Sequence, residues 1–202
     1  TGADAAAFLH GQLTQDVQSL DGTEARLAGY CSPKGRLLAS GVIWTSATDE
    51  VLFACHASVL PATLKRLSMF VLRARCVLSD AGAAVTLVGV AGARAREAVG
   101  ALPVWGQRAT ADGTWIRLPD VAGITRAWQV VAAEVAPQPD PQALALWQRL
   151  EVDSGIATIE AATADLFVPQ MLNYEVVGAV NFHKGCYPGQ EVVARSQYRG
   201  TT

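Results

Sequence analysis

Hydrophobic residues in the first part of the chain recur with the periods of helices and strands. Apolar residues at positions 9, 13, 17 and 20 follow each other at three- and four-residue spacing, which predicts a helix over 3–20 with Gln15 and Asp16 on its polar side. A hairpin is predicted over 24–44, because its turn Ser32-Pro33-Lys34-Gly35 has proline and glycine where a type I turn prefers them. A strand over 51–55 and a helix with apolar positions 60, 64 and 67, capped by Ser58, follow.

The second part of the chain begins after a stretch of alternating side chains. This alternation predicts a strand over 70–78 in which Cys76 faces the core. The pattern resets near residue 80. Beyond it we expect a strand over 84–91, a helix over 93–99 closed by Gly100, strands over 114–118 and 125–133, a proline-rich linker over 137–141, a helix over 142–152 with a buried face of Ala143, Leu146, Trp147 and Leu150, and a helix over 190–197 ended by Gly200.

This mixed order of strands and helices predicts an α+β fold with mostly antiparallel sheets, because a doubly wound parallel sheet would need strict alternation of the two. The pattern reset near residue 80 and the linker near 140 predict three parts. They are a first α+β subdomain over 1–80, a second over 81–140, and a helix with the segment that follows it over 141–202.

Composition narrows the class of protein. Half of the 202 residues are apolar and the net charge is −2, which indicates a globular chain with a sizeable core. This balance argues against direct binding of nucleic acid or of an anionic membrane. No apolar run is long enough to span a bilayer and no signal peptide is visible, so we expect a cytoplasmic protein. The chain lacks an initiator methionine, and we expect both ends to be trimmed.

The four cysteines show no pairing or metal-site spacing. Cys31, Cys55, Cys76 and Cys186 include no Cys-x-x-Cys motif, which predicts free thiols in a reducing compartment. Cys55 and Cys76 lie in predicted strands and are expected to be core residues.

Reactive side chains are densest over residues 183–195, called below the 183–195 segment, which reads His-Lys-Gly-Cys-Tyr-Pro-Gly-Gln-Glu-Val-Val-Ala-Arg. Gly185, Pro188 and Gly189 predict a sharp turn before the helix over 190–197. Cys186 would then precede a helix N-terminus with Lys184 close by, and both features favour a thiolate over a thiol.

Competing motifs are weak. Residues 89–94 join a strand to a helix but lack the Gly-x-Gly-x-x-Gly spacing of dinucleotide sites, and the chain has no P-loop and no Gly-x-Ser-x-Gly elbow. A catalytic pair of Cys186 with His183 stays open, although sequence neighbours rarely form one. His10 and His56 are alternative bases, with nothing to favour either.

Glu151 and Asp153 lie where a helix is expected to end. The dipole of a helix disfavours negative charge at this end. Both carboxylates are either solvated, or a cationic or hydrogen-bond-donating ligand explains them.

The 183–195 segment also carries a resemblance. Residues 184–191 match the pattern Lys-Gly-Cys-Tyr-x-Gly-Gln-Glu, with Pro188 in the variable position. With this motif the chain resembles the YgfZ-type proteins, folate-binding relatives of the glycine-cleavage T-protein, an aminomethyltransferase. Residues 8–17, 34–36, 153–156, 167–170 and Asn173 resemble the same family, so the resemblance covers nearly the whole chain, with 80–140 least distinctive.

The resemblance implies a fold and a cofactor. The fold is a set of ferredoxin-like subdomains around a central folate cavity, followed by a C-terminal β-barrel that we expect to be missing from this sequence. The cofactor is tetrahydrofolate or a one-carbon derivative. In the T-protein relatives a Glu at the position of Asp153 hydrogen-bonds the pterin. A carboxylate can accept such paired N–H donors bidentately. The Asp153 side chain is one methylene group shorter than that Glu. The other implied cofactor-binding residues are Gln170, Asn173, Lys34 and Arg36, with Arg195 and Arg199 as further candidates for the glutamate tail and Trp128, Phe167 and Tyr187 for stacking.

The role implied by the family is the assembly or repair of iron–sulfur clusters in client enzymes, with an indirect connection to tRNA modification. Cys186 would be the reactive thiol or a transient metal ligand, and Lys184 would lower the pKa of this thiol or hold an anion. No stable metal site is expected, because an iron–sulfur centre usually needs four ligands. The remaining implied residues of this site are Gly185, Tyr187, Gly189, Gln190, Glu191 and Arg195.

Two other interpretations stay open. In the first, the chain is a folate-dependent aminomethyltransferase or another one-carbon transferase, against which the cysteine in the motif argues. In the second, it is a folate-regulated interaction module in which Cys186 is merely packed.

Overall fold

The structure is a computed structural model that describes residues 1–138 and 140–199, except for the side chain of Arg199. The chain forms two compact units. The first contains residues 1–21, 26–79 and those from 157 onward, and the second contains residues 22–25 and 80–156. The three-part division at residues 80 and 140 stays a prediction.

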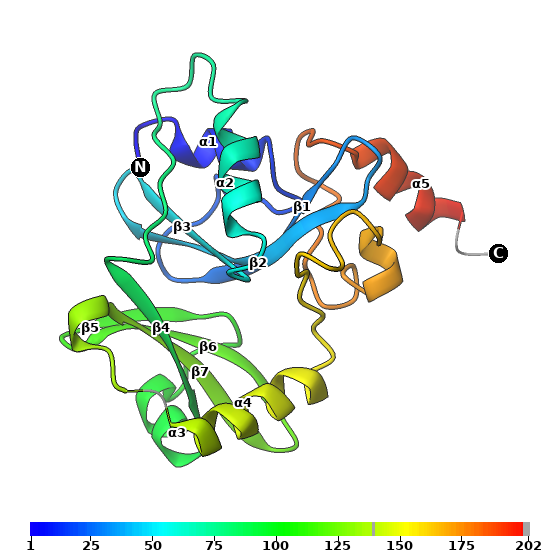
Figure 1. Cartoon of the computed structure of the whole chain (residues 1–202). Helices are drawn as coiled ribbons and strands as arrows, with labels where there is room; N and C mark the ends of the chain where they lie inside the picture. Colours follow the sequence, from blue (N-terminus) through cyan, green and yellow to red (C-terminus); the bar gives the residue numbers. More distant parts are fainter. Residues whose placement is uncertain (139, 200–202) are drawn as a thin grey trace. The chain divides into compact units, whose positions relative to one another are not determined.

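A three-stranded sheet with the strand order β1-β2-β3 organises the first unit. Strands β2 and β3 are antiparallel, with Ile43 opposite Phe53. Helices α1 and α2 lie beside this sheet (Figure 1). The fully buried side chains of Val17, Leu37 and Ile43 contribute to the core. The elements of this part are α1 (Ala5–His10), β1 (Ala25–Cys31), β2 (Leu37–Ala47), β3 (Glu50–Cys55) and α2 (Leu60–Ser68).

Strands β1 and β2 are joined by the turn predicted from the sequence. The Gly35 amide donates to the Ser32 carbonyl at 2.9 Å, and the Ser32 amide donates to the Arg36 carbonyl at 2.8 Å. Gly35 has a φ of +71°, a left-handed conformation that glycine adopts without steric cost. The turn prediction is confirmed, and the left-handed glycine completes a common hairpin type.

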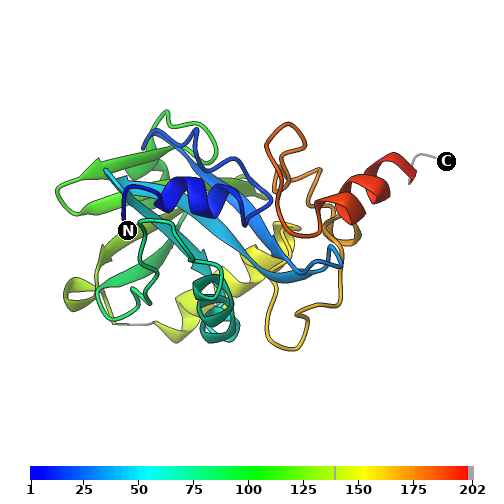
Figure 2. The ribbon, with the colours of Figure 1, turned by 90° about the horizontal axis from the view of Figure 1, so that it is seen from above.

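Residues 157–199 return to the first unit and gather at the tip of this hairpin, as Figure 1 and Figure 2 both show. The Leu37 amide donates to the Phe167 carbonyl and the Asp165 amide donates to the Leu37 carbonyl, both at 2.8 Å. This stretch contains the 3₁₀-helix η2 (Pro169–Leu172) and α5 (Gln190–Arg199). The helix predicted over 190–197 is confirmed, and Gly200, expected to end it, lies outside the described residues.

A four-stranded antiparallel sheet with the strand order β4-β7-β6-β5 forms the second unit. Val90 and Ala127 lie opposite each other on one face and pack with Ala95 of α3. Gly89 faces the other way, and a Cβ on it would stand 2.6 Å from the Trp147 ring of α4. Because side chains alternate along a strand, α3 and α4 cover opposite faces. The elements are β4 (Val85–Ala91), α3 (Ala93–Val99), β5 (Gln107–Thr110), β6 (Gly113–Val121), β7 (Ile124–Ala132), η1 (Ala133–Val135) and α4 (Pro141–Asp153).

Arg126 fastens α4 to this sheet. Its side chain is almost completely buried, with the guanidinium 5.5 Å from the Trp147 ring centroid. The same guanidinium donates to Glu151 Oε1 at 2.7 Å. Glu151 is therefore explained by a buried partner in its own unit, and neither a ligand nor solvation is needed to account for it.

Most predicted elements are confirmed. The α+β class, the antiparallel sheets, the strands over 51–55, 84–91, 114–118 and 125–133, and the helices over 93–99 and 142–152 are all present. Strand β5 was missed, because its four residues carry one apolar side chain, Ala109, and no alternation. On α4, Ala143 and Leu146 are exposed, contrary to the predicted buried face, whereas Leu150 is buried.

The predicted helix over 3–20 is wrong beyond His10. Leu13 forms a β-bridge with Tyr30, and the Thr14 amide donates to the Gly29 carbonyl at 2.9 Å. Strand β1 thus takes the backbone groups that a longer helix would have paired internally. Gln15, assigned to a polar face, is buried.

The predicted strand over 70–78 is also wrong, and these residues form an irregular segment. Val77 exchanges two hydrogen bonds with the first residue, Thr1, at 2.8 and 2.9 Å, and Leu72 is 85% exposed. Cys76 is nevertheless buried, as expected, whereas Cys55 is half-buried.

The predicted cap of α2 is wrong as well. The Ser58 hydroxyl accepts from the Ala161 amide at 3.0 Å, and Val59 occupies the N-cap position without a side-chain hydrogen bond. Across the part of the chain that the structure describes, no helix has both the length and the apolar character needed to cross a bilayer.

Candidate functional site

Two glycines place the 183–195 segment on the β1–β2 hairpin. Gly189 has a φ of +79°, and a Cβ on it would stand 2.6 Å from the Gly35 nitrogen. A Cβ on Gly35 would in turn stand 2.8 Å from Cβ of Val192 in α5. Only glycine fits at either position, so the start of α5 is held against the hairpin tip.

The N-terminal residues hold the other end of this segment. The Asn181 amide donates to the Thr14 carbonyl at 2.9 Å, and the Thr14 hydroxyl donates to the Ala179 carbonyl at 2.6 Å. Gln15 Nε2 donates to the Gly178 carbonyl at 2.8 Å. Residues 14–15 and 178–181 are therefore joined by a continuous set of buried or partly buried hydrogen bonds.

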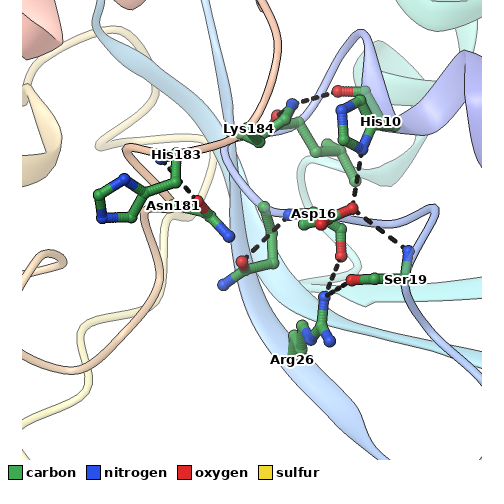
Figure 3. Close-up of polar contacts among 9 residues, drawn as sticks. His10, Asp16, Ser19, Arg26, Asn181, His183 and Lys184 are labelled. Carbon is green, nitrogen blue, oxygen red and sulfur yellow. Dashed lines mark hydrogen bonds and ion pairs between the residues drawn. The ribbon is translucent and has the colours of Figure 1, made fainter.

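Lys184 is buried and points into the protein. Its ammonium donates to the His10 carbonyl (Figure 3) and to the Leu13 carbonyl, the latter at 2.7 Å. It also lies 5.0 Å from the Tyr187 ring centroid. Burial lowers the pKa of Lys184 to about 8, against the opposing attraction of the Asp16 and Cys186 charges. Lys184 is thus first a tether between the segment and residues 10–13, a role that the sequence did not indicate.

Tyr187, also expected at the site, is buried. Burial raises the pKa of its hydroxyl, and Lys184 covers its ring. Its ring is therefore not an open stacking surface. Trp128 and Phe167, the other stacking candidates, are half-buried.

Cys186 is exposed, unlike the other three cysteines. Cys31 is buried, which raises the pKa of its thiol to about 12, and burial also raises the pKa of Cys76. Cys55 is half-buried. Cys186 is therefore not packed, contrary to that part of the interaction-module interpretation, and the module role itself stays open.

A histidine–aspartate pair lies beside the segment; the sequence had suggested His10 as one of two alternative bases but had not paired it with Asp16. His10 Nδ1 lies 3.0 Å from Asp16 Oδ1, which also accepts from the Ser19 amide at 3.3 Å (Figure 3). Partial burial alone would raise the pKa of Asp16, but the hydrogen bonds from Ser19 and the interaction with His10 outweigh it and lower this pKa. The matching stretch 8–17 was the available signal, because it contains both residues.

The remaining expected residues are divided between the two units. In the first, Gln190 is half-buried, while Glu191, Arg195 and Lys34 are exposed. Arg36 is exposed and donates to the Leu166 carbonyl at 3.0 Å. The side chain of Arg199 lies outside the described residues.

Gln170 and Asn173 have structural tasks in the first unit. Gln170 Nε2 donates to the Val193 carbonyl of α5 at 2.8 Å, whereas its Oε1 is buried without a partner among the described residues. Asn173 is exposed and adopts the left-handed conformation that ends η2. Both residues thus shape the surroundings of α5.

Asp153 is the last residue of α4, in the second unit. Its half-exposed carboxylate has one described ion pair, with the exposed Arg149 at 3.5 Å. Such a carboxylate keeps acceptor positions for the paired N–H groups of a pterin, so the residue fits the expected contact. Among residues 1–138 and 140–199 no three His, Cys, Asp or Glu side chains gather to hold a metal ion.

Comparison with known proteins bears on this site. No family model matches the chain. A curated protein from Edwardsiella ictaluri (strain 93-146), named tRNA-modifying protein YgfZ, is 33% identical over 216 residues that include 99% of this chain. The chain is thus similar to a YgfZ-type protein over nearly its whole length. It spans 64% of the length of this YgfZ relative.

The YgfZ relationship agrees with the fold. The crystal structure of the glycine cleavage system aminomethyltransferase T from Bartonella henselae matches 98% of the chain and 59% of that protein, with a TM-score of 0.62 and 14% identity. This likeness concerns the fold alone. It shows that the chain has the fold of the corresponding part of that aminomethyltransferase.

Proposed function

We propose that the chain binds tetrahydrofolate or a one-carbon derivative and serves as an accessory protein for the assembly or repair of iron–sulfur clusters in client enzymes. Through these enzymes it would support tRNA modification in the cytoplasm without contacting RNA. The observation that carries the proposal is the exposed Cys186, in a segment that matches the YgfZ-type motif and is held rigidly by packing.

The folate part of the proposal rests on Asp153. Its carboxylate accepts the paired N–H donors of the pterin, a charge-assisted contact that favours the bound state. Within the first unit, the exposed cations Lys34, Arg36 and Arg195 suit an anionic group such as a glutamate tail. Bound folate would supply or accept the one-carbon unit, and the chain would position it.

The thiol part rests on Cys186. An accessible thiol reacts or ligates as the thiolate, whereas buried thiols are inert. Cys186 is the exposed one of the four, so chemistry by a cysteine of this chain falls to it. Replacing Cys186 by Ala should abolish rescue of a client iron–sulfur enzyme in a strain that lacks the endogenous protein and leave folding intact.

Calorimetric titration with tetrahydrofolate tests the folate part. Wild type should bind, Asp153→Ala should bind at least about tenfold more weakly because the charge-assisted contact is lost, and Glu134→Ala should bind like wild type. Glu134 is a matched control because it is an exposed carboxylate of the same unit. A wild-type chain that gives no heat or other binding signal would remove folate from the proposal.

The T-protein fold favours one alternative, a folate-dependent aminomethyltransferase or another one-carbon transferase. The two functions differ in turnover. Robust formation of methylene-tetrahydrofolate from an aminomethyl donor would establish the alternative, and its absence together with folate binding would support the accessory role.

A further inference from the structure

We propose that His10 and Asp16 form a proton-accepting pair for the Cys186 thiol, an inference that rests on the proposed role of Cys186. The pair is defined by the 3.0 Å contact of His10 Nδ1 with Asp16 Oδ1, and both side chains are largely buried, at 17% and 27% exposure. A carboxylate only accepts hydrogen bonds, so Nδ1 carries the proton and Nε2 presents its lone pair.

The free nitrogen of His10 faces the loop that carries the thiol. A Cβ on Gly185 would stand 3.7 Å from His10 Nε2, an ordinary contact distance. Residue 185 has no side chain, so nothing from this position covers Nε2. Cys186 is the next residue, with its Cα about 3.8 Å further along the chain. Cys186 therefore lies next to the residue that contacts Nε2, and its proton reaches Nε2 through one bridging water molecule.

Hydrogen bonds from neighbouring residues hold both His10 and Asp16 in place. The Lys184 ammonium donates to the His10 carbonyl, which fastens the histidine to the loop two residues before Cys186 (Figure 3). On the other side, Arg26 donates to the Asp16 carbonyl and the Ser19 amide to the Asp16 carboxylate. The charged groups that face the pair are therefore the cations Lys184 and Arg26, besides Asp16 itself.

The step is a balanced acid–base reaction. The S–H bond of Cys186 breaks, its proton joins His10 Nε2, and the electron pair stays on sulfur. Asp16 stabilises the imidazolium that forms, in the manner of other carboxylate-oriented histidines. The nearby Lys184 ammonium attracts the thiolate. Asp16 acts through His10 and is a positioning residue.

The other two histidines are less suited. His183 is exposed, and its amide donates to Asn181 Oδ1. His56 contacts the Ser58 hydroxyl at 2.8 Å and lies 3.7 Å from Glu160. Neither of these contacts involves the 183–195 segment. Both therefore serve as matched controls.

Alkylation of Cys186 with iodoacetamide, followed by peptide mass spectrometry across neutral pH, tests the proposal. His10→Gln should slow alkylation near pH 7 by about tenfold and move the pH profile to higher pH, because the base is lost. Asp16→Asn should slow alkylation and move the pH profile in the same direction, but by a smaller amount. Added imidazole should restore the rate of His10→Ala and leave wild type unchanged, which separates a lost base from a disturbed fold.

His56→Gln and His183→Gln should alkylate like wild type. A folded His10→Gln protein with the wild-type rate, or equal slowing by His183→Gln, would overturn the proposal. The outcome is separate from that for the proposed function. Dependence on His10 without folate binding would leave the pair standing and remove the folate role. The opposite result is also possible. If folate binds and client rescue needs Cys186, but the alkylation rate does not depend on His10, the proposed function stands and the proton-accepting pair is refuted.

Discussion

Gly189 lies so close to Gly35 that a Cβ on the first would stand 2.6 Å from the backbone nitrogen of the second. Both residues have left-handed φ angles, +79° and +71°. One belongs to the 183–195 segment and the other to a hairpin turn more than a hundred residues earlier. The glycine in the motif is thus required by close packing of two backbones as well as by local turn geometry.

Replacing Gly189 by Ala should therefore destabilise the first unit strongly. Left-handed strain costs about 1–2 kcal/mol and the backbone clash adds to it, so we expect a total of about 3 kcal/mol or more in urea unfolding. Gly178→Ala is the control, because Gly178 has a φ of +74° with open space around its Cβ position. The free energy of unfolding of Gly178→Ala should fall only by the cost of left-handed strain, about 1–2 kcal/mol. Equal losses for both variants would contradict the packing argument.

Lys184 should make stability depend on alkaline pH. Its pKa is about 8 in the folded chain, below the ordinary 10.5. Between these values the unfolded chain binds more protons, so the contribution of Lys184 to stability rises with pH and is complete above about 10.5. The difference in unfolding free energy between wild type and Lys184→Met, measured by urea unfolding at several pH values, should grow from pH 8 upward. A difference that shrinks over this range would refute the assignment.

The hairpin turn and the cap of α4 were predictable because their causes are local. Ser32-Pro33-Lys34-Gly35 specifies its own turn, and the Asp140 side chain accepts from the Gln142 amide at 2.9 Å, as the residue types indicate. The end of α1 was not predictable, because Thr14 finds its side-chain acceptor 165 residues away, at Ala179. Tertiary hydrogen bonds there outweigh an apolar pattern that suits a helix.

The same error concealed part of the candidate site. On the helix predicted over 3–20, His10 and Asp16 would be rotated about 240° from each other and could not meet. Because the helix ends at His10, the chain folds back and brings the two side chains together. The burial of Lys184 was likewise hidden, since its acceptors His10 and Leu13 are 174 and 171 residues away.

The two carboxylates at the end of α4 should differ in their effect on stability. Glu151 neutralises the buried Arg126, so Glu151→Gln should cost about 1–3 kcal/mol in urea unfolding. Asp153 pairs with the exposed Arg149, so Asp153→Asn should cost no more than about 0.5 kcal/mol. A large loss for Asp153→Asn would contradict this contrast and would weaken Asp153 variants as probes of folate binding.

Cys186 should be the fast-reacting thiol of the native chain. Ellman's reagent should modify one thiol per chain rapidly and four in denaturant, because Cys31 and Cys76 are buried and Cys55 is half-buried. Cys186→Ser should remove the rapid phase, and Cys55→Ser should retain it. A rapid phase that survives in Cys186→Ser would show that another thiol is accessible, and chemistry at the 183–195 segment would then no longer follow from exposure.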